Sequence, residues 1–419
     1  MAKRVAVIGG GTSGLACIKC CLDEGLEPVC FETSDDIGGL WRFKENPDPD
    51  RASIYHSLII NTSKEMMCFS DFPIPAHFPN YMHNSLIMDY FHMYADHFQL
   101  KRHICFQTKV LHVTPRPDFP HSGQWDVETE SKDGRREKQV FDAVMVCTGH
   151  HCHPNLPLQD FPGIDTFKGK FFHSRDYKNP EEWRGKRVVV IGIGNSGGDI
   201  AVELSRMAKQ VYLSTRRGSW ILNRVGDKGV PIDMLFNNRM NVCLSQLLPV
   251  GFINHFGEKQ LNKRFNHKLY GLQPAHRYVA AQRHTIQVDY IPYMDELAKQ
   301  VGVCPPILKL LLTDPRLALN IIFGPCTPYQ FRLHGPGQWD GARQAILTQW
   351  DRVTEPLKTR CTPEPQSQRS SHSLMFSVSA AVLLSALYYS RASLHALIAD
   401  PSSLLDKIRA FVPLPLTTQ

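Results

Sequence analysis

Two glycine-rich segments carry the residue types and spacing that bind phosphates. Gly9-Gly10-Gly11-Thr12-Ser13-Gly14 and Gly192-Ile193-Gly194-Asn195-Ser196-Gly197 both match the pattern G-x-G-x-x-G. In this pattern the first glycine permits a tight turn, the second lets the backbone approach a pyrophosphate, and the third lets a helix pack closely on a strand. The helix N-terminus then directs its partial positive charge at the phosphates. The sequence therefore predicts two dinucleotide sites, although an ordinary glycine turn is the alternative at each.

The residues that follow each motif distinguish the two nucleotides. Glu32 stands eighteen residues after Gly14, where a carboxylate can accept hydrogen bonds from a ribose. After the second motif, Ser214-Thr215-Arg216-Arg217 takes the place of an acid. Two guanidinium groups suit a 2′-phosphate, so this site is predicted to prefer NADP to NAD. The alternative is that these arginines belong to a solvated turn.

The elements that must position these residues are strand–helix–strand units. Apolar runs and their spacing predict the first unit over residues 5–8, 13–24 and 28–32, closed by a strand at 143–147, and the second over 187–191, 196–208 and 211–215. Two such units predict an α/β fold with two Rossmann-like dinucleotide-binding domains. A mixture of helix and loop is expected over 223–276, and a helix over 294–301.

The end of the chain differs in composition. Residues 374–389 form a run of 16 without charge, and a second apolar patch covers 394–399. A spanning helix needs about 20 apolar residues, so we expect a tilted or interfacial membrane anchor, with a buried terminal helix as the alternative. The predicted organisation is a first dinucleotide domain at 1–154, a second at 155–276, a C-terminal part at 277–365, an anchor at 374–399 and a tail at 400–419.

Composition narrows the function classes. The net charge of +7 arises from 47 Lys and Arg against 40 Asp and Glu, without a long basic block, which argues against nucleic-acid binding. Twelve scattered cysteines and a strand that begins at once, with no secretory signal, predict free thiols in a reducing compartment. The dense Cys and His cluster over 147–153 lacks the separated pairs typical of zinc sites, so no metal is expected. Asn61-Thr62-Ser63 matches a glycosylation acceptor that a cytosolic chain would not use.

One segment carries a more specific pattern. Residues 167–178 match F-x-G-x-x-x-H-x-x-x-Y-K just before the second glycine motif. Together with both glycine motifs and the stretches 32–43, 61–66, 282–287, 323–326 and 350–352, this resembles the flavin-containing monooxygenases of vertebrate microsomes. The resemblance implies FAD in the first site and NADPH in the second, on the cytosolic face of the endoplasmic reticulum membrane.

The resemblance also implies a reaction and site residues. NADPH reduces FAD, oxygen adds to give a C4a-hydroperoxyflavin, and a soft amine nitrogen or sulfur of a small molecule takes one oxygen atom. Asn61 matches the active-site asparagine of the family, with Thr62 beside it. Gly38-Gly39-Leu40-Trp41 is expected to lie along the flavin nucleotide.

The chain departs from this family at one junction. Residues 272–277 run directly into 278–282, where relatives carry a long block that includes a strand ending in F-A-T-G-Y. Losing strands from a parallel sheet exposes edges and apolar faces. Three alternatives therefore stay open: an active N- or S-oxygenating enzyme, a catalytically impaired variant that binds nucleotide or partners, and oxygen insertion beside a ketone in the Baeyer–Villiger manner. A homo-oligomer is one further alternative.

Overall fold

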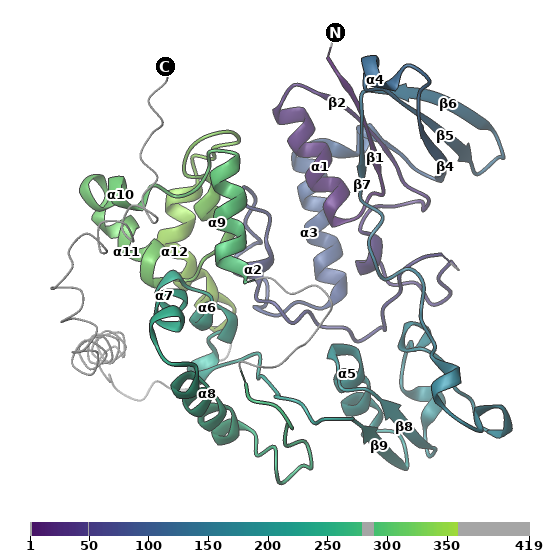
Figure 1. Ribbon diagram of the computed structural model, residues 1–419, viewed down its shortest axis with the longest axis vertical. Coiled ribbons are helices and arrows are strands. Elements are labelled where there is room, and N and C mark those ends of the chain that lie inside the picture. Colours follow the sequence, from purple (N-terminus) through teal and green to yellow (C-terminus); the bar gives the residue numbers. More distant parts are fainter. Residues whose placement is uncertain (1, 49, 279–288, 359–419) are drawn as a thin grey trace. The chain divides into compact units, whose positions relative to one another are not determined.

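A four-stranded parallel sheet forms the first dinucleotide-binding unit. The computed structural model describes residues 2–48, 50–278 and 289–358. The strand order is β3-β2-β1-β7, with bounds β1 (Arg4–Ile8), β2 (Glu27–Phe31), β3 (Ile104–Cys105) and β7 (Ala143–Val146). Helix α1 (Thr12–Asp23) connects β1 to β2 (Figure 1). The predicted strand–helix–strand unit and its closing strand are confirmed, within one residue at each end for the unit.

An antiparallel sheet packs against the first one. It consists of β4 (Thr108–Pro115), β5 (Trp125–Ser131) and β6 (Arg136–Phe141), in that order, with the short helix α4 (Phe119–Ser122) between β4 and β5. Val127 and Phe141 are fully buried and share a hydrophobic cluster with Ala6 and Phe31 of the parallel sheet. This second sheet was not expected from the sequence. It covers part of the parallel sheet that would otherwise face solvent.

The second unit is smaller than a complete dinucleotide-binding domain. Its sheet has two parallel strands, β8 (Arg187–Ile191) and β9 (Gln210–Ser214), connected by α5 (Asn195–Leu204). Val188, Val190 and Val211 pack against a cluster that includes Ile200 and Leu204 of α5. The other face of the sheet is open to solvent.

That open face is apolar. Val189 is 60% exposed, Ile191 63% and Tyr212 53%. Val146, at the end of edge strand β7, is 73% exposed. Parallel sheets are normally covered on both faces, so these exposed side chains agree with the expectation that an internal block, which includes a strand, is missing.

The segment after the junction completes the main core. Leu15 and Ile18 of α1 and Tyr90 of α3 (Asn84–His97) belong to the same buried cluster as Ile321 of α11 (Pro315–Phe323) and Ile346 of α12 (Ala342–Thr354). Residues more than 300 positions apart therefore share one core. The missing block does not separate the C-terminal part from the first unit.

The remaining described elements are helices. They are α2 (Lys64–Met67), α6 (Ile232–Phe236), α7 (Arg239–Leu247), α8 (Val250–Arg264), α9 (Tyr290–Gln300) and α10 (Ile307–Thr313). Helix α9 begins four residues before the predicted helix at 294–301. The 3₁₀ turns are η1 (Gly39–Trp41), η2 (Leu100–His103), η3 (Leu158–Asp160), η4 (Ile164–Thr166), η5 (Ser174–Asp176), η6 (Glu181–Trp183), η7 (Asp227–Gly229), η8 (Pro328–Arg332) and η9 (Glu355–Leu357).

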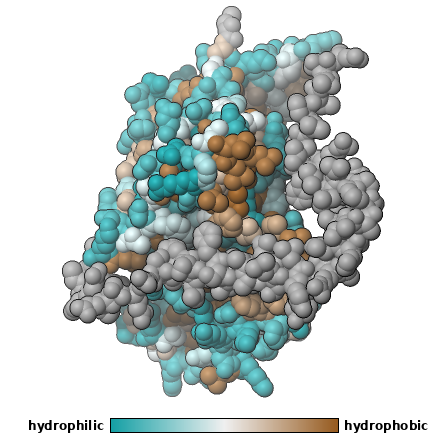
Figure 2. All heavy atoms as spheres, turned by 90° about the vertical axis from the view of Figure 1, so that its left-hand side faces the viewer, coloured by the Kyte–Doolittle hydropathy of each residue, from teal (hydrophilic) through white to brown (hydrophobic). Residues whose placement is uncertain are grey.

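Helices α10 and α11 carry an exposed apolar patch. Figure 2 shows it on the face that carries these helices, and their exposed apolar side chains are Leu308, Leu311, Leu312, Leu319 and Phe323. The predicted anchor at 374–399 and the tail at 400–419 lie outside the described residues. Among the helices that are described, none has the length and hydropathy of a membrane span.

Candidate active site

The first glycine turn has the geometry that its pattern predicts. Gly9 has φ +107°, and a Cβ there would lie 2.6 Å from the carbonyl oxygen of Cys147. A Cβ on Gly14 would lie 1.9 Å from the carbonyl oxygen of Gly9. At Gly11 the nearest atom to such a Cβ is Cα of Gly39, at 3.6 Å. Gly9 and Gly14 are therefore required by the protein itself, whereas Gly11 leaves the backbone accessible to a pyrophosphate.

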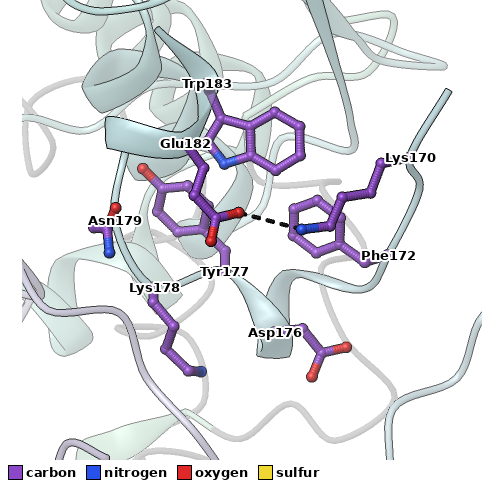
Figure 3. Close-up of a pocket in the computed structure, with 8 residues that line it drawn as sticks. All are labelled: Lys170, Phe172, Asp176, Tyr177, Lys178, Asn179, Glu182 and Trp183. Carbon is purple, nitrogen blue, oxygen red and sulfur yellow. Dashed lines mark hydrogen bonds and ion pairs between the residues drawn. The ribbon is translucent and has the colours of Figure 1, made fainter. Parts of the chain in front are cut away.

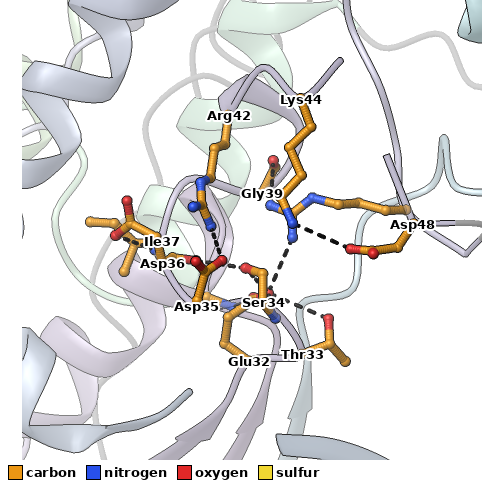
Figure 4. Close-up of polar contacts among 12 residues, drawn as sticks. Glu32, Thr33, Ser34, Asp35, Asp36, Ile37, Gly39, Arg42, Lys44 and Asp48 are labelled. Atoms are coloured by element: carbon orange, nitrogen blue, oxygen red, sulfur yellow. Dashed lines mark hydrogen bonds and ion pairs between the residues drawn. The ribbon is translucent and has the colours of Figure 1, made fainter. Parts of the chain in front are cut away.

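Glu32 lies directly beside this turn, immediately after β2 (Figure 4). Its carboxylate is buried, and Oε2 accepts a hydrogen bond from the backbone N–H of Gly10 at 2.7 Å. Oε1 accepts from the backbone N–H of Ser34 at 2.8 Å and from its hydroxyl at 2.7 Å. Nη1 of Arg51 is 3.7 Å from Oε1. These contacts fix the carboxylate beside the turn, where it is predicted to accept hydrogen bonds from ribose hydroxyls.

The segment Gly38-Gly39-Leu40-Trp41 covers the same turn. The backbone N–H of Gly38 donates to the carbonyl of Gly10 at 3.1 Å. Nη2 of Arg51 donates to the carbonyl of Gly39 at 3.1 Å. Arg42 forms an ion pair with Asp35 at 2.6 Å (Figure 4). Gly38 and Gly39 thus lie directly beside the first glycine turn, and the donors and acceptors at Gly11 and Glu32 fit a flavin dinucleotide. That Leu40 and Trp41 contact the flavin stays a prediction.

The second glycine turn keeps the same backbone geometry. Gly192 has φ +97°, and a Cβ on Gly197 would lie 2.2 Å from the carbonyl oxygen of Gly192. Helix α5 begins at Asn195, so its N-terminus faces the turn. Gly194 has no atom within 4 Å of a Cβ position. The residues Gly192, Gly194, Asn195, Ser196 and Gly197 are therefore together in one glycine turn at the N-terminus of α5, where a phosphate is predicted to bind.

The two arginines after β9 are available to an anion. Arg216 and Arg217 are exposed, and Thr215 is half-buried. Within the described part of the chain, neither guanidinium group forms an ion pair with a carboxylate. Two uncompensated positive charges at the carboxyl end of β9 fit a 2′-phosphate.

Asn61 is exposed and held by a residue far away in the sequence. Nε of Arg224 donates to its Oδ1 at 2.7 Å. Nη2 of Arg224 also lies 3.5 Å from Oδ2 of Asp199 on α5, which accepts a hydrogen bond from the hydroxyl of Tyr55 at 2.7 Å. Because its oxygen is occupied, the Asn61 amide presents its NH₂ group as a donor. The amide is thus linked through one guanidinium to the helix of the second glycine turn.

The residues after Asn61 are fixed by three later elements. The backbone N–H of Ser63 donates to Asp233 of α6 at 2.7 Å. Glu65 accepts from the hydroxyl of Tyr329 in η8 at 2.8 Å and from Nε of Arg352 in α12 at 3.0 Å. Burial raises the pKa of Glu65. The stretch 61–66 is therefore held both by α6 and by the C-terminal part of the chain.

Lys64 is a buried ammonium that no carboxylate of the described residues contacts. Its Nζ donates to the carbonyls of Ala76 and Phe78, at 2.5 and 2.8 Å. Burial lowers the pKa of Lys64 to about 8. The side chain is fully inaccessible to solvent, so its role is to hold the loop before α3 rather than to contact substrate.

The segment 167–178 contacts both residues 53–56 and helix α5. The hydroxyl of Tyr177 donates to Glu203 at 2.8 Å, and Nζ of Lys178 donates to the hydroxyl of Ser53 at 2.6 Å. The carbonyl of Lys178 accepts from the backbone N–H of His56 at 2.9 Å. These contacts explain why tyrosine and lysine stand at the end of this signature.

A small pocket accompanies this segment. Its volume is about 110 Å³, which is too small for a dinucleotide. Figure 3 shows Phe172, Tyr177 and Trp183 around it, with Lys170 directed at Glu182, 3.2 Å away. The pocket therefore belongs to the connection between segments rather than to a cofactor site.

Sequence reasoning missed Arg224, Asp199 and Asp233. Arg224 and Asp233 belong to no local motif, and Asp199 follows the second glycine motif without being part of its pattern. Each reaches the segment 55–63 across more than 140 residues. The Cys and His cluster at 147–153 shows no group of three metal-binding side chains in the described residues. There, the thiol of Cys147 is directed at Cys17.

Comparison with known proteins places these features in one family. A family model described as flavin-binding monooxygenase-like matches residues 2–281 and 275–391. The chain is similar to flavin-containing monooxygenase 5 of Cavia porcellus, with 46% identity over 511 positions, covering 88% of this chain and 96% of that protein. It is 41% identical to dimethylaniline monooxygenase [N-oxide-forming] 2 of Oryctolagus cuniculus over 503 positions, covering 86% and 94%.

Solved structures were also matched, one of which is an S-oxygenase. It is the S-allyl-L-cysteine S-oxygenase from Allium sativum, at 30% identity and a TM-score of 0.48. The match covers 54% of this chain and 55% of that one.

The alignments also locate the missing block. The two family matches meet at residues 275–281, the junction inferred from the sequence. An alignment of 511 positions against a chain of 419 residues leaves at least 92 positions without a residue in this chain. The expectation that an internal block is missing is confirmed.

Proposed function

Because this chain belongs to the flavin-binding monooxygenase-like family, which uses FAD and NADPH, we propose that it oxygenates soft nucleophilic nitrogen or sulfur atoms of small molecules with O₂. The observation that carries the proposal is the placement of Asn61. Its carbonyl is bound to Arg224, and Arg224 also reaches Asp199 on the helix of the second glycine turn. The NH₂ group of Asn61 is thus oriented by a residue that also contacts the helix of the proposed NADPH site.

The residues of the chain bind and orient, while the cofactor supplies the redox chemistry. Bound FAD would accept a hydride from NADPH and activate oxygen. Glu32 would accept hydrogen bonds from the ribose of FAD, and the turn at Gly11 would receive its pyrophosphate. Arg216 and Arg217 would hold the 2′-phosphate of NADPH. Asn61 would donate its N–H to the nicotinamide or to oxygen at the reacting edge.

A second candidate function rests on the open sheet. The exposed Val189, Ile191 and Tyr212 mark a face that a complete domain would cover. A chain with this face open could bind nucleotide without turnover and act as a catalytically impaired variant. Oxygen insertion beside a ketone is the third candidate. The products formed separate it from the first.

The test uses the purified full chain in detergent. We expect bound flavin close to one per chain, NADPH consumption, and N-oxide or sulfoxide from a tertiary amine or a thioether. Asn61→Ala should keep the flavin and lose product formation, whereas Asn155→Ala, at an exposed asparagine, should change neither. Colourless protein that consumes no NADPH would favour the impaired variant, and esters from ketones would favour the third candidate.

We also propose that the chain associates with the endoplasmic reticulum membrane, with its catalytic part in the cytosol. The charge-free run at 374–389, the net charge of +7 and the exposed leucines of α10 support this. Deletion of 374–399 should reduce cosedimentation with phosphatidylcholine and phosphatidylserine vesicles. Equal sedimentation of the deleted and complete chains would contradict the anchor.

A further inference from the structure

Two cysteine side chains meet between α1 and the end of β7. Cys17 lies three residues after Gly14 on α1, and Cys147 follows directly after β7. Their Sγ atoms are 3.6 Å apart, with the thiol of Cys147 donating to Sγ of Cys17. Both residues are half-buried. The pair is thus close together without being sealed from solvent.

The pair also adjoins the first glycine turn. The backbone N–H of Cys147 donates to the carbonyl of Ile8 at 2.9 Å, and its carbonyl oxygen would be 2.6 Å from a Cβ on Gly9. Gly9 begins the turn and Cys17 lies in the helix that follows it. A covalent bond between the two sulfurs would therefore connect both sides of the FAD turn.

Cys17 differs in reactivity from the other cysteines of α1. The hydrogen bond from Cys147 lowers the pKa of Cys17 to about 7. On the same helix, burial raises the pKa of Cys20 and raises that of Cys21 to about 11. Because the thiolate is the nucleophile, Cys17 is the cysteine of α1 that reacts first near neutral pH.

We propose that Cys17 and Cys147 are a dithiol site that hydrogen peroxide oxidises to a disulfide. The Cys17 thiolate attacks one peroxide oxygen, the O–O bond breaks, and Cys17 becomes a sulfenic acid while the leaving hydroxide takes up a proton to form water. The sulfur of Cys147 then attacks the sulfenic sulfur, the S–O bond breaks, and the released hydroxide takes the thiol proton as a second water. Two thiols lose two electrons, and one peroxide is reduced to two waters.

The geometry requires only a short movement. A disulfide has an S–S distance of about 2.05 Å, so the sulfurs must approach by about 1.5 Å. The bond would close a loop across 130 residues, from Cys17 to Cys147. A cross-link of this length restricts the unfolded chain strongly, so oxidation should raise the unfolding midpoint.

The experiment treats the reduced full chain with equimolar hydrogen peroxide at pH 7.5. Remaining thiols are blocked with N-ethylmaleimide, and tryptic peptides are analysed by mass spectrometry. We expect one cross-linked peptide joining Cys17 to Cys147, loss of two free thiols, a higher unfolding midpoint, and reversal of all three by dithiothreitol. The readout requires neither FAD nor turnover, so it is independent of the proposed function.

Variants distinguish the role of Cys17, which attacks the peroxide, from that of Cys147, which attacks the sulfenic acid. Cys147→Ser should accumulate sulfenic acid at Cys17, detected with dimedone, whereas Cys17→Ser should show none at Cys147 under the same conditions. Cys20→Ser, on the same helix, should still form the cross-link. Circular dichroism verifies that each variant folds. If Cys17→Ser does not fold, Cys17→Ala takes its place. The proposal is overturned if both thiols stay fully alkylated after peroxide, or if Cys17 pairs with Cys20 or Cys21.

Discussion

Nε of Arg224 donates a hydrogen bond of 2.7 Å to Oδ1 of Asn61, although 163 residues separate the two in the chain. The same guanidinium reaches Asp199 on α5. An amide side chain can rotate by half a turn and exchange its oxygen with its nitrogen, but a guanidinium offers only donors. Arg224 therefore fixes the orientation in which Asn61 presents its NH₂ group.

Replacing Arg224 should impair catalysis without removing FAD. In Arg224→Met the Asn61 amide loses its partner, and misplacement of a reacting group by about 1 Å can reduce turnover roughly 100-fold. We expect kcat to fall by about that factor, flavin content to stay unchanged, and Arg224→Lys to recover part of the rate. Steady-state kinetics with a thioether measures this, with Arg184→Met as the exposed control. An unchanged kcat would remove Arg224 from this role.

Gly11 provides a separate test of the FAD turn. Its Cβ position is open in the protein, whereas those of Gly9 and Gly14 meet backbone oxygen. Gly11→Ala should therefore fold with an unfolding midpoint near that of the parent chain and still bind FAD at least 10-fold more weakly, because the methyl group blocks the pyrophosphate. Gly9→Ala and Gly14→Ala should lose stability as well as FAD. Flavin titration by fluorescence, with Gly251→Ala as control, measures the difference, and normal affinity in Gly11→Ala would refute the site.

Arg216 should determine the preference for the phosphorylated nucleotide. It is exposed, and in the described chain it forms no ion pair. A charge-assisted hydrogen bond to phosphate contributes about 1.5–3 kcal/mol, so Arg216→Glu should raise the KM for NADPH at least 10-fold and leave that for NADH within about twofold. Arg206→Glu, an exposed arginine before β9, serves as control. Equal changes for both nucleotides would contradict the assignment.

The parts predicted from the sequence are those that depend on neighbouring residues. Strand β8 was predicted at its observed bounds because four consecutive β-branched residues precede the glycine turn. The position of Glu32 beside the first glycine turn was predicted because one helix and one strand set its distance from Gly14. The glycine turns follow from backbone sterics alone.

The parts that escaped prediction depend on contacts distant in sequence. Arg224 carries no motif, and its contact with Asn61 exists only once the chain has folded. Helix α12 was not predicted, although its Arg352 binds the buried Glu65. The sheet of β4, β5 and β6 was also missed, because strands such as Thr108–Pro115 mix polar and apolar residues without strict alternation. Local pattern does not report which surface such a strand will cover.

Lys64 predicts a pH dependence of stability. Burial lowers its pKa to about 8 in the folded chain, against about 10.4 when unfolded. Between these values the unfolded chain binds more protons, so the free energy of unfolding should increase with pH, by roughly 1 kcal/mol per unit from pH 8 to 9.5. Urea unfolding of the parent chain and Lys64→Met measures the difference.

The Lys64→Met variant should lack this dependence and should be less stable by about 1–3 kcal/mol, since two carbonyls lose their donor. Lys209→Met, at an exposed lysine before β9, should retain the parent slope. A parent slope that is flat or negative over this pH interval would show that Lys64 is not held with a lowered pKa.

The open face of β8 and β9 should limit solubility rather than stability. Val189 and Ile191 point away from the cluster that packs on α5, and both are more than half exposed. Exposed apolar strands with free edges promote association between chains. Replacing both by Thr keeps β-propensity, so the double variant should lower aggregation severalfold in light scattering and change the urea midpoint little. The matched pair Val188→Thr and Val190→Thr, on the covered face, should instead destabilise the chain. If the Val189 and Ile191 replacements destabilised it equally, that face would be buried in the folded protein, and the missing strands would not explain the exposure.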